Sequence, residues 1–322
     1  RGGAGFPTHK KWEFVKAAEG SPKYVICNAS EGEMGVFKDL YILENHLEEV
    51  FEGMKLAMDY LETNKAYFNI NEEYWNKLNN KIEQLAEQYE KDNYIFTIYK
   101  EPPSYIGGEE TALLNAIEGD RIEPRLKPPY PASQGLYGKP SLINNVETFY
   151  NVFLADKGMF DRKRFYAISG KVRNPGVYYL PDFYTIEKIL NETDNWPTFE
   201  FFVQIGGSAS GPVFRSDQLA EQEMTGAGSI EVYSEKTTEI EILKKWFEFY
   251  KKESCGKCTP CREGSYQLFE MIKEIDDVDE IPWKNISKII NNMEQTSFCA
   301  LGKSLALPIK TYTKNILHKN LL

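Results

Sequence analysis

Four of the five cysteines in this 322-residue chain lie close together near its C-terminal end. Cys255, Cys258 and Cys261 have the spacing C-x2-C-x2-C, and Cys299 follows later in the chain. Iron–sulfur clusters are bound by four thiolates, and three thiols on one loop with a distant fourth suit the corners of a [4Fe-4S] cluster. Zinc is the alternative, although zinc more usually binds paired C-x2-C units or mixed Cys/His sets.

The other candidate metal ligands lie elsewhere in the sequence. The three histidines, His9, His46 and His318, are all distant in sequence from the cysteine run. Cys27 follows a short apolar stretch at the end of an expected strand, so we interpret it as a core residue. The spacing therefore favours an iron–sulfur cluster over zinc.

Three further segments could bind a nucleotide or a flavin. Residues 1–6, R-G-G-A-G-F, would let backbone N–H groups approach a phosphate or a ring closely. This is not the G-x-G-x-x-G fingerprint, and a tight turn is the alternative. Segments 27–33 and 105–112 combine small and acidic residues, whose carboxylates can accept hydrogen bonds from ribose or ribityl hydroxyls. The same residues could instead cap helices.

The elements that must position these residues fall into three regions. In the first, strands alternate with helices, which is typical of an open α/β sheet: strands at 24–27 and 94–99, and helices at 40–60, 110–116 and 146–153. An irregular proline-rich segment, 124–140, lies between them, and such long segments are usually functional or disordered.

The second region has the short strands and turns of a small β-rich α+β domain. Its expected strands are 165–168, 177–180, 201–205 and 230–233, with a helix at 185–191. The third region is helical, with apolar residues recurring at steps of three and four along 240–250. Further helices are expected at 264–275, 283–293 and 304–317, so the cysteines would lie at the turns of a helical bundle.

Composition excludes several classes of protein. The net charge is −10 and no basic stripe is present, which argues against nucleic-acid binding. No apolar run reaches the ~20 residues that span a bilayer, and no signal segment opens the chain, so direct membrane insertion is not expected. Few, clustered cysteines indicate a reducing compartment and a cytoplasmic location. Because the chain opens with Arg1 inside a glycine motif, we expect the natural protein to extend upstream.

Taken together, these segments resemble the NADH-binding flavoprotein subunit of respiratory complex I and its relatives in NAD-linked hydrogenases and formate dehydrogenases. The motifs that carry the resemblance are RGGAGFPT (1–8), CNASEGEMGVFKD (27–39), YIGGEETALLNAIEG (105–119), RLKPPYPASQGLYGKPSLINNVETF (125–149), ESCGKCTPCREG (253–264) and SFCALG (297–302). The resemblance implies an α/β multidomain fold. Its parts would be a Rossmann-like FMN/NADH domain (1–160), a ubiquitin-like β-grasp domain (161–235) and a four-helix bundle with the cluster (236–322).

The same resemblance implies the binding residues, motif by motif. Those for FMN are Gly2, Gly3, Lys11, Asn28, Glu31, Gly108, Glu109, Asn144, Asn145 and Thr148. Those for NADH are Phe6, Phe14, Glu33, Glu110 and Tyr130, with the aromatic rings stacking on adenine. The cluster ligands would be Cys255, Cys258, Cys261 and Cys299.

Three positions depart from the pattern that the family usually has. Ser30 stands where an aspartate is usual, Met34 replaces a common proline, and Gly107 replaces a common cysteine. Ser30 removes one anion from the neighbourhood of the flavin. These departures are the sequence support for an alternative in which the chain is a non-catalytic scaffold that carries only the cluster.

The function that the resemblance implies is an FMN-dependent NADH dehydrogenase. NADH would pass a hydride to FMN, and single electrons would leave through the cluster to other iron–sulfur subunits of a hetero-oligomeric complex. A thioredoxin-like [2Fe-2S] subunit is the expected partner, and any attachment to a membrane's inner face would come through partners. The equivalent subunit of an NAD(P)-linked hydrogenase or formate dehydrogenase is the alternative. Glu33 and Glu110 would repel a 2′-phosphate if they lie near it, which favours NADH over NADPH.

Overall fold

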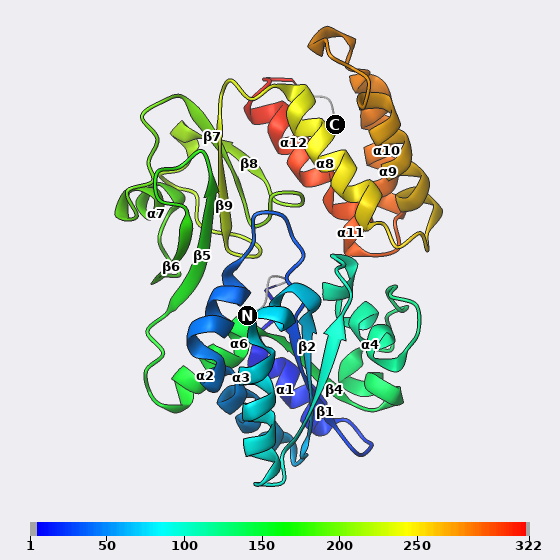
Figure 1. Cartoon of the computed structure of the whole chain (residues 1–322). Helices are drawn as coiled ribbons and strands as arrows, with labels where there is room; N and C mark the ends of the chain where they lie inside the picture. Colours follow the sequence, from blue (N-terminus) through cyan, green and yellow to red (C-terminus); the bar gives the residue numbers. More distant parts are fainter. Residues whose placement is uncertain (1–4, 320–322) are drawn as a thin grey trace. The chain divides into compact units, whose positions relative to one another are not determined.

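A computed structural model describes residues 5–319 of the chain, which form two compact units. Of the described residues, 5–32 and 37–163 form unit 1, and 33–36 and 164–319 form unit 2. Gly2 and Gly3, which we predict to bind FMN, lie outside the described residues. Figure 1 colours the chain from blue at the N-terminus to red at the C-terminus.

Unit 1 is built on a four-stranded sheet of order β3-β2-β1-β4 in which all neighbours are parallel. The strands are β1 (Tyr24–Ala29), β2 (Lys65–Asn71), β3 (Ile95–Glu101) and β4 (Ser141–Asn145). The chain moves outward from β1 to β3 and then returns to the other side of β1. The direction of winding therefore reverses between β1 and β4, and open α/β sheets bind ligands beyond the carboxyl ends of the strands at such a point.

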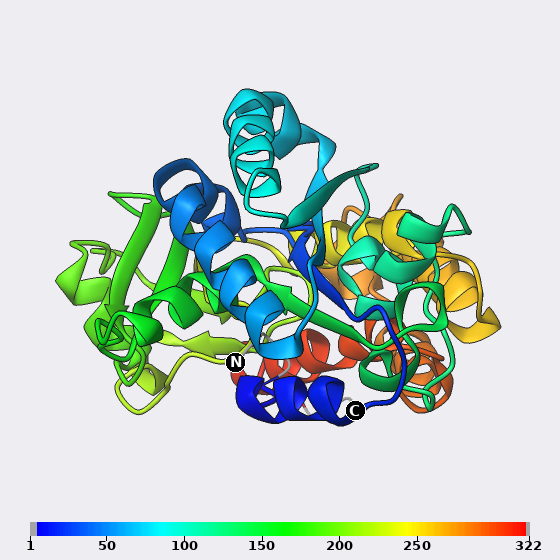
Figure 2. The same cartoon turned by 90° about the horizontal axis from the view of Figure 1, so that it is seen from below.

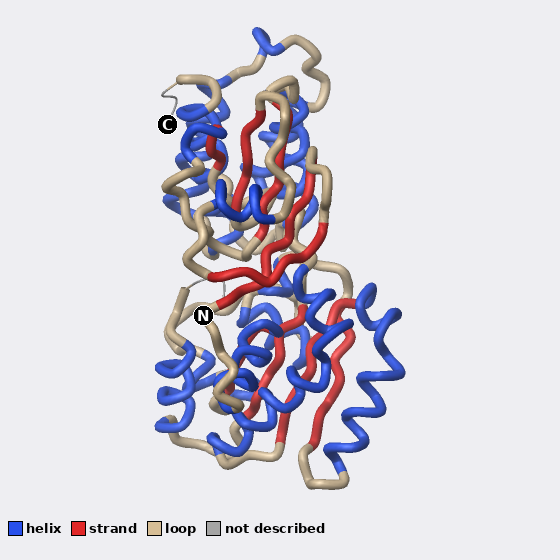
Figure 3. Tube along the Cα trace, turned by 90° about the vertical axis from the view of Figure 1, so that its left-hand side faces the viewer, coloured by secondary structure: helices blue, strands red, loops and turns tan. Residues whose placement is uncertain are grey.

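Helices lie on both sides of this sheet (Figure 3). They are α1 (Thr8–Ala17), α2 (Lys38–Leu61), α3 (Glu72–Glu90), α4 (Glu110–Glu118), α5 (Pro131–Gln134) and α6 (Val146–Asp156), with 3-10 turns η1 (Ile106–Gly108) and η2 (Leu136–Gly138). Leu113 and Leu114 of α4 pack on one face of the sheet, against Ile26 and Ile143. On α2, the helix drawn in a lighter blue than α1 in Figure 2, Phe51 stacks on Phe68 of β2 with ring centroids 5.2 Å apart.

The strands and helices expected in this region are present, with ends shifted by a few residues. The elements that were not expected are α1, β2, α3 and β4, together with the short α5, η1 and η2. A signal for α3 exists in the sequence, because Asn71 accepts a hydrogen bond from the Tyr74 amide at 2.9 Å as an N-cap, and Trp75, Leu78 and Ile82 are buried at helical spacing. The predicted irregular segment contains only the short α5 and η2.

Unit 2 contains a mixed five-stranded sheet of order β6-β5-β9-β7-β8. Its strands are β5 (Lys163–Gly170), β6 (Gly176–Pro181), β7 (Phe201–Ile205), β8 (Val213–Arg215) and β9 (Ser229–Ser234). β5 and β9 are parallel, whereas β7 is antiparallel to both β8 and β9. Helix α7 (Ile186–Glu192) buries Ile186, Ile189 and Leu190 in the core of this sheet.

The rest of unit 2 is helical: α8 (Glu239–Glu253), α9 (Thr259–Ile272), α10 (Trp283–Thr296), α11 (Ala300–Ser304) and α12 (Ala306–Asn315), with 3-10 turns η3 (Ser216–Gln218) and η4 (Val278–Glu280). The helices pack directly on the sheet. Trp246 of α8 and Gln204 of β7 are both fully buried, and the Trp246 indole N–H donates to Gln204 Oε1 at 3.1 Å. Sheet and helices thus form one compact unit, and the domain boundary between 235 and 236 stays a prediction. None of the helices within residues 5–319 has both the length and the apolar character needed to cross a membrane.

Candidate functional site

Three helices of unit 1 begin beside the carboxyl ends of its strands, and each is capped by a residue that we predict to bind FMN. Glu31 accepts a hydrogen bond from the Asp39 amide of α2 at 2.9 Å. Glu109 accepts from the Thr111 and Ala112 amides of α4, and Asn145 accepts from the Glu147 amide of α6 at 3.0 Å. Helix N-termini combine N–H donors with a partial positive charge, which attracts anions: carboxylates occupy that place at α2 and α4, whereas the cap of α6 is the neutral amide of Asn145. The capping alternative and the binding alternative therefore apply to the same residues.

The asparagines at the ends of β1 and β4 lie together at the reversal point. Asn28 is in register with Asn145, whose side chain donates to the Asn28 carbonyl at 3.4 Å. The Asn28 amide donates to the Gly108 carbonyl at 2.9 Å. In the amide orientation that satisfies both groups, Asn144 accepts from the Trp12 indole N–H at 3.0 Å. Trp12 is a site residue that the motifs did not identify.

Two loops meet backbone to backbone beside these asparagines. A Cβ added at Gly108 would lie 3.1 Å from the Ser30 carbonyl oxygen, and one added at Gly32 would lie 2.9 Å from the Tyr105 Cα. Neither glycine has room for a side chain without movement of backbone. This close approach explains the two glycines, and the binding of a flavin beside them stays a prediction.

Two lysines neutralise the acidic pair at the start of α4. Lys11 Nζ lies 3.3 Å from Glu110 Oε2 and also donates to the Ile143 carbonyl. Lys127 Nζ lies 2.7 Å from Glu109 Oε1 and 3.1 Å from Glu110 Oε1. Burial alone would raise the pKa of Glu110, but the two lysines outweigh it and hold this pKa below its usual value. The two lysines thus balance the negative charges of Glu109 and Glu110, so Glu110 would repel a nearby 2′-phosphate less strongly. This weakens the electrostatic argument that favours NADH over NADPH.

The aromatic residues predicted to stack on adenine are exposed. Phe6 and Phe14 are 45% and 58% exposed, with ring centroids 6.3 Å apart. Tyr130 is 58% exposed and directly precedes α5, which packs against α1. Exposed rings of this size mark a surface available to a flat ligand. Glu33 belongs to unit 2, where it accepts hydrogen bonds from the Ala209 amide and the Ser210 hydroxyl, and its contact with NADH stays a prediction.

A buried ionic network supports the caps of α2 and α6. Lys38 forms ion pairs with Asp39 and with Glu147, the latter at 3.3 Å, and donates to Asn145 Oδ1. Burial lowers the pKa of Lys38, but its carboxylate neighbours outweigh burial and raise it overall, so Lys38 stays charged. Thr148, in the first turn of α6, is buried beside this network. Lys38 and Asp39 are further site residues that the motifs did not single out.

Glu31 makes the stability of the flavin-free protein depend on pH. Burial, assisted by Asp39, raises the pKa of Glu31 to about 8, against roughly 4.3 in an unfolded chain. Between these values the folded state holds the extra proton, so the free energy of unfolding falls as pH rises. As the pH is raised from about 5 to about 8.5, we expect the melting temperature of Glu31→Gln to fall less than that of the wild type. The matched control is Glu73→Gln, which removes an exposed carboxylate of α3, and parallel melting profiles for Glu31→Gln and the wild type would refute the assignment.

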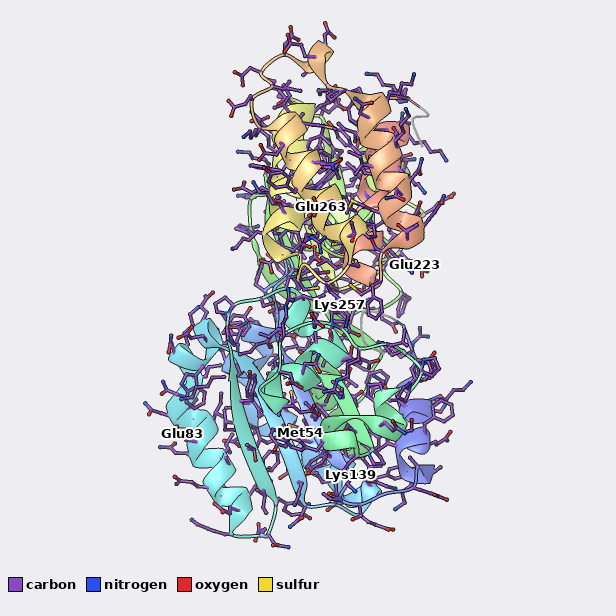
Figure 4. The ribbon with its side chains drawn as sticks, turned by 90° about the vertical axis from the view of Figure 1, so that its right-hand side faces the viewer. Met54, Glu83, Lys139, Glu223, Lys257 and Glu263 are labelled. Atoms are coloured by element: carbon purple, nitrogen blue, oxygen red, sulfur yellow. The ribbon has the colours of Figure 1, made fainter. Side chains whose placement is uncertain are left out.

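The four cysteines of the predicted cluster site come together in unit 2. Cys258 is the N-cap of α9 and Cys299 the N-cap of α11. The Phe298 amide donates to Cys258 Sγ at 3.5 Å, so the second segment lies directly against the first. A Cβ added at Gly302 would lie 2.9 Å from the Cys261 Cβ, which explains a glycine there. Figure 4 labels Lys257, between the first two cysteines, and Glu263 on α9.

The surroundings of these thiols suit iron rather than isolated reactive cysteines. Burial raises the pKa of Cys261 to about 11, with the other three cysteines adding to the shift and Ser254 opposing it. Burial also raises the pKa of Cys299, while the Leu301 and Gly302 amides oppose it. Amides that point at a sulfur stabilise a thiolate once a metal displaces its proton. Within residues 5–319 no three Cys, His, Asp or Glu side chains are placed to hold one metal ion, and a cubane, which spreads its thiolates over several irons, does not need such a group.

Two family models match the two regions of the chain that contain these residues. The model of the Nuo51 FMN-binding domain matches residues 1–154, and that of the NADH-ubiquinone oxidoreductase-F iron-sulfur binding region matches residues 241–319. The NADH-quinone oxidoreductase F 2 subunit of Rhizobium meliloti (strain 1021) is 34% identical over 98% of this chain and 83% of its own length. The corresponding F subunit of Aquifex aeolicus (strain VF5) is 36% identical over 94% of this chain and 78% of its own length.

A solved structure is similar over the whole chain. It is the NAD+-reducing [NiFe]-hydrogenase in the H2-reduced state, with a TM-score of 0.91 and 28% sequence identity. The match covers 100% of this chain and 60% of the hydrogenase chain. Two family models at the two sites and relatives above 30% identity over most of their length give one answer: the chain belongs to the family of NADH-quinone oxidoreductase F subunits.

Proposed function

We propose that this chain is the NADH-oxidising subunit of a multi-subunit electron-transfer complex and that it holds FMN in unit 1 and a [4Fe-4S] cluster in unit 2. The observation that carries the proposal is the gathering of three capped helix N-termini around the β1–β4 reversal point. This is where an open α/β sheet binds a phosphate-bearing cofactor. The family models of an FMN-binding domain and an iron–sulfur region support the two cofactors.

The residues of unit 1 position the reactants. When bound, FMN supplies the hydride acceptor and the conversion from two-electron to one-electron transfer. Asn28, Asn144 and Gly108 would orient the cofactor at the ends of β1 and β4, and the N-terminus of α6 would face its phosphate. Phe6, Phe14 and Tyr130 would stack on the adenine of NADH and so hold the nicotinamide near the flavin. No side chain has to move a proton for hydride transfer.

In unit 2, Cys255, Cys258, Cys261 and Cys299 are the proposed cluster ligands. The buried side of the site, at Cys261, is closed by Ser254, whose hydroxyl lies 3.4 Å from the Cys261 sulfur. Amide donors at the N-terminus of α11 would stabilise the charge on the Cys299 thiolate. The chain thereby supplies ligands, hydrogen bonds and exclusion of water, which are the terms by which a protein sets a cluster's potential.

The finer architecture also belongs to this proposal. The mixed sheet with α7 would be the β-grasp domain (161–235), and α8, α9, α10 and α12 would be the four-helix bundle (236–322). The FMN/NADH domain would span 1–160. The strand order and helix order of unit 2 support the second and third domains, and the structural similarity to the hydrogenase chain supports all three.

The electron acceptor lies on other chains of the complex. The relatives are named as subunits of NADH-quinone oxidoreductase, which supports a hetero-oligomer, and a thioredoxin-like [2Fe-2S] subunit is the partner that we propose. Similarity to an NAD+-reducing hydrogenase supports a second candidate, the equivalent subunit of a hydrogenase or formate dehydrogenase. Identification of the copurifying subunits decides between them. Location at the inner face of a membrane would follow from such partners.

The proposed reaction is tested on the complex purified without oxygen. NADH is expected to bleach the flavin absorbance rapidly, and a parallel titration with NADPH tests the choice of nucleotide. Phe14→Ala removes one stacking face, and because stacking of a base is worth about 1–3 kcal/mol, we expect KM for NADH to rise roughly tenfold with little change in kcat. Phe183→Ala, which removes a similarly exposed ring in unit 2, is the control. Iron–sulfur absorbance without a reducible flavin would refute the proposal and favour the scaffold alternative.

A further inference from the structure

A buried carboxyl group that the proposed chemistry does not use lies at the end of β3. Glu101 is 1% exposed and its neighbour Asn69, on β2, is fully buried. The Ser30 hydroxyl donates to Glu101 Oε2, and the Asn69 amide donates to the same oxygen at 2.7 Å. The Asn69 amide also reaches the Ser30 hydroxyl oxygen at 2.6 Å. One carboxyl thus joins the ends of β1, β2 and β3.

The second oxygen of this carboxyl decides which residue can stand at position 107. Glu101 Oε1 is buried and has no hydrogen-bond partner among the described residues. It occupies the space into which a Cβ at position 107 would project. Gly107 is not among the glycines with positive φ, so the carboxyl group, and not the backbone conformation, calls for glycine here.

Glu101 reaches the predicted flavin site through a short series of hydrogen bonds. The Ser30 amide donates to Asn28 Oδ1 at 3.1 Å, and the Asn28 side chain donates to the Gly108 carbonyl. Ser30 and Gly107 are two of the positions at which the sequence departs from the usual family pattern, and both contact the same carboxyl. Burial raises the pKa of Glu101, while Ser30 and Asn69 oppose the shift.

We propose that Glu101 is a positioning residue of the flavin site and that Ser30, Gly107 and Glu101 are an interdependent set. The carboxyl ties the loop after β1 to the end of β3 and fills the space next to Gly107. It also places an acidic group near the flavin site, so Glu101 acts there through its charge as well. The part of the inference that concerns flavin rests on the proposed function. The interdependence of the three residues is a property of unit 1 alone.

A double-mutant cycle on the full chain, freed of flavin, tests the interdependence. Gly107→Ala alone is expected to lower the melting temperature by about 5 °C or more, because the new methyl group overlaps Glu101. In a Glu101→Ala background the same change is expected to lower it by less than about 2 °C. Gly32→Ala is the control, since its Cβ meets the backbone of Tyr105 and Glu101→Ala cannot relieve that contact. Equal losses for Gly107→Ala in both backgrounds would overturn the interdependence.

The charge of Glu101 is tested by the midpoint potential of the bound flavin in the purified complex. Glu101→Gln keeps the shape but removes the acidic group, so we expect reduced flavin to bind about tenfold more tightly relative to oxidised flavin. For a two-electron couple this is a rise of about 30 mV. Glu101→Asp should retain the wild-type potential, and Glu73→Gln, an exposed carboxylate on α3, should not shift it.

An unchanged potential in Glu101→Gln would overturn the electrostatic role. A wild-type complex without flavin would instead refute the proposed function, and the melting-temperature cycle would still decide whether Gly107 and Glu101 depend on one another. The two failures are therefore distinguishable.

Discussion

Cys258→Ala is expected to abolish the iron–sulfur cluster and leave the flavin chemistry intact. Cys258 is the N-cap of α9, and its sulfur accepts a hydrogen bond from the Phe298 amide, so it links the two segments that carry the four thiols. A cubane that loses one of its four thiolates is no longer held. We expect the iron content of the complex to fall from about four atoms to less than about one atom for this site. NADH should still bleach the flavin. The rate of electron transfer to the partner subunits should fall at least about 100-fold, which corresponds to an activation free energy higher by roughly 2.7 kcal/mol or more.

Cys27→Ala supplies the matched control for this experiment. Cys27 is fully buried in β1, in register with Phe68 of β2, and it belongs to the core of unit 1. Its replacement should lower the melting temperature and leave the iron content unchanged. Retention of iron in Cys258→Ala, or loss of iron in Cys27→Ala with the fold preserved, would contradict the ligand assignment.

Lys38→Met is expected to produce the largest loss of stability among changes in unit 1. Its ammonium group is buried between Asp39 and Glu147, and its removal leaves two carboxylates without a counter-charge in the interior. Breaking a buried ion pair from one side costs about 3–5 kcal/mol. For a unit of this size that corresponds to a fall of roughly 10 °C in melting temperature, which differential scanning calorimetry measures.

Lys55→Met provides the comparison on the same helix. Lys55 pairs with Asp59 at 3.3 Å one turn along α2, and both side chains are partly exposed. Such pairs contribute less than about 1 kcal/mol, so its melting temperature should fall by only a few degrees. Adding Glu147→Gln to Lys38→Met should recover part of the lost stability, because one uncompensated charge disappears. Equal losses for the two lysines would show that the Lys38 network is not a buried ionic centre.

Local sequence patterns predicted the elements whose own residues carry a strong signal. The apolar stretches of β1, β7 and β9 and the periodic faces of α2, α8 and α10 were expected and are present. The strand β4 was not expected, because its sequence, Ser141–Asn145, ends in two asparagines that strand propensity disfavours. Its pairing with β1 is a long-range contact that no local window contains.

The resemblance to a family named residues that the fold brings together, and their roles as FMN ligands stay a prediction. Asn28, Gly108, Asn144 and Asn145 do lie together, at the carboxyl ends of β1 and β4. Glu31, Glu109 and Asn145 cap three helices. Capping was the alternative for segments 27–33 and 105–112, but only the structure shows that Glu31 caps α2 from outside that helix. Lys127 and Lys11 balance Glu109 and Glu110, and Glu33 belongs to unit 2.

The sequence by itself therefore determined which residues could do chemistry: three cysteines at cluster spacing with a fourth further along the chain, and segments rich in glycine and acidic residues. Only the tertiary structure decided which charges face one another. Lys38 and Glu147 are far apart in the sequence, as are Ser30 and Glu101, and each pair meets because parallel strands and the helices beside them end at one edge of the sheet. The energies of buried charges depend on such long-range contacts and on burial, which local sequence patterns do not specify.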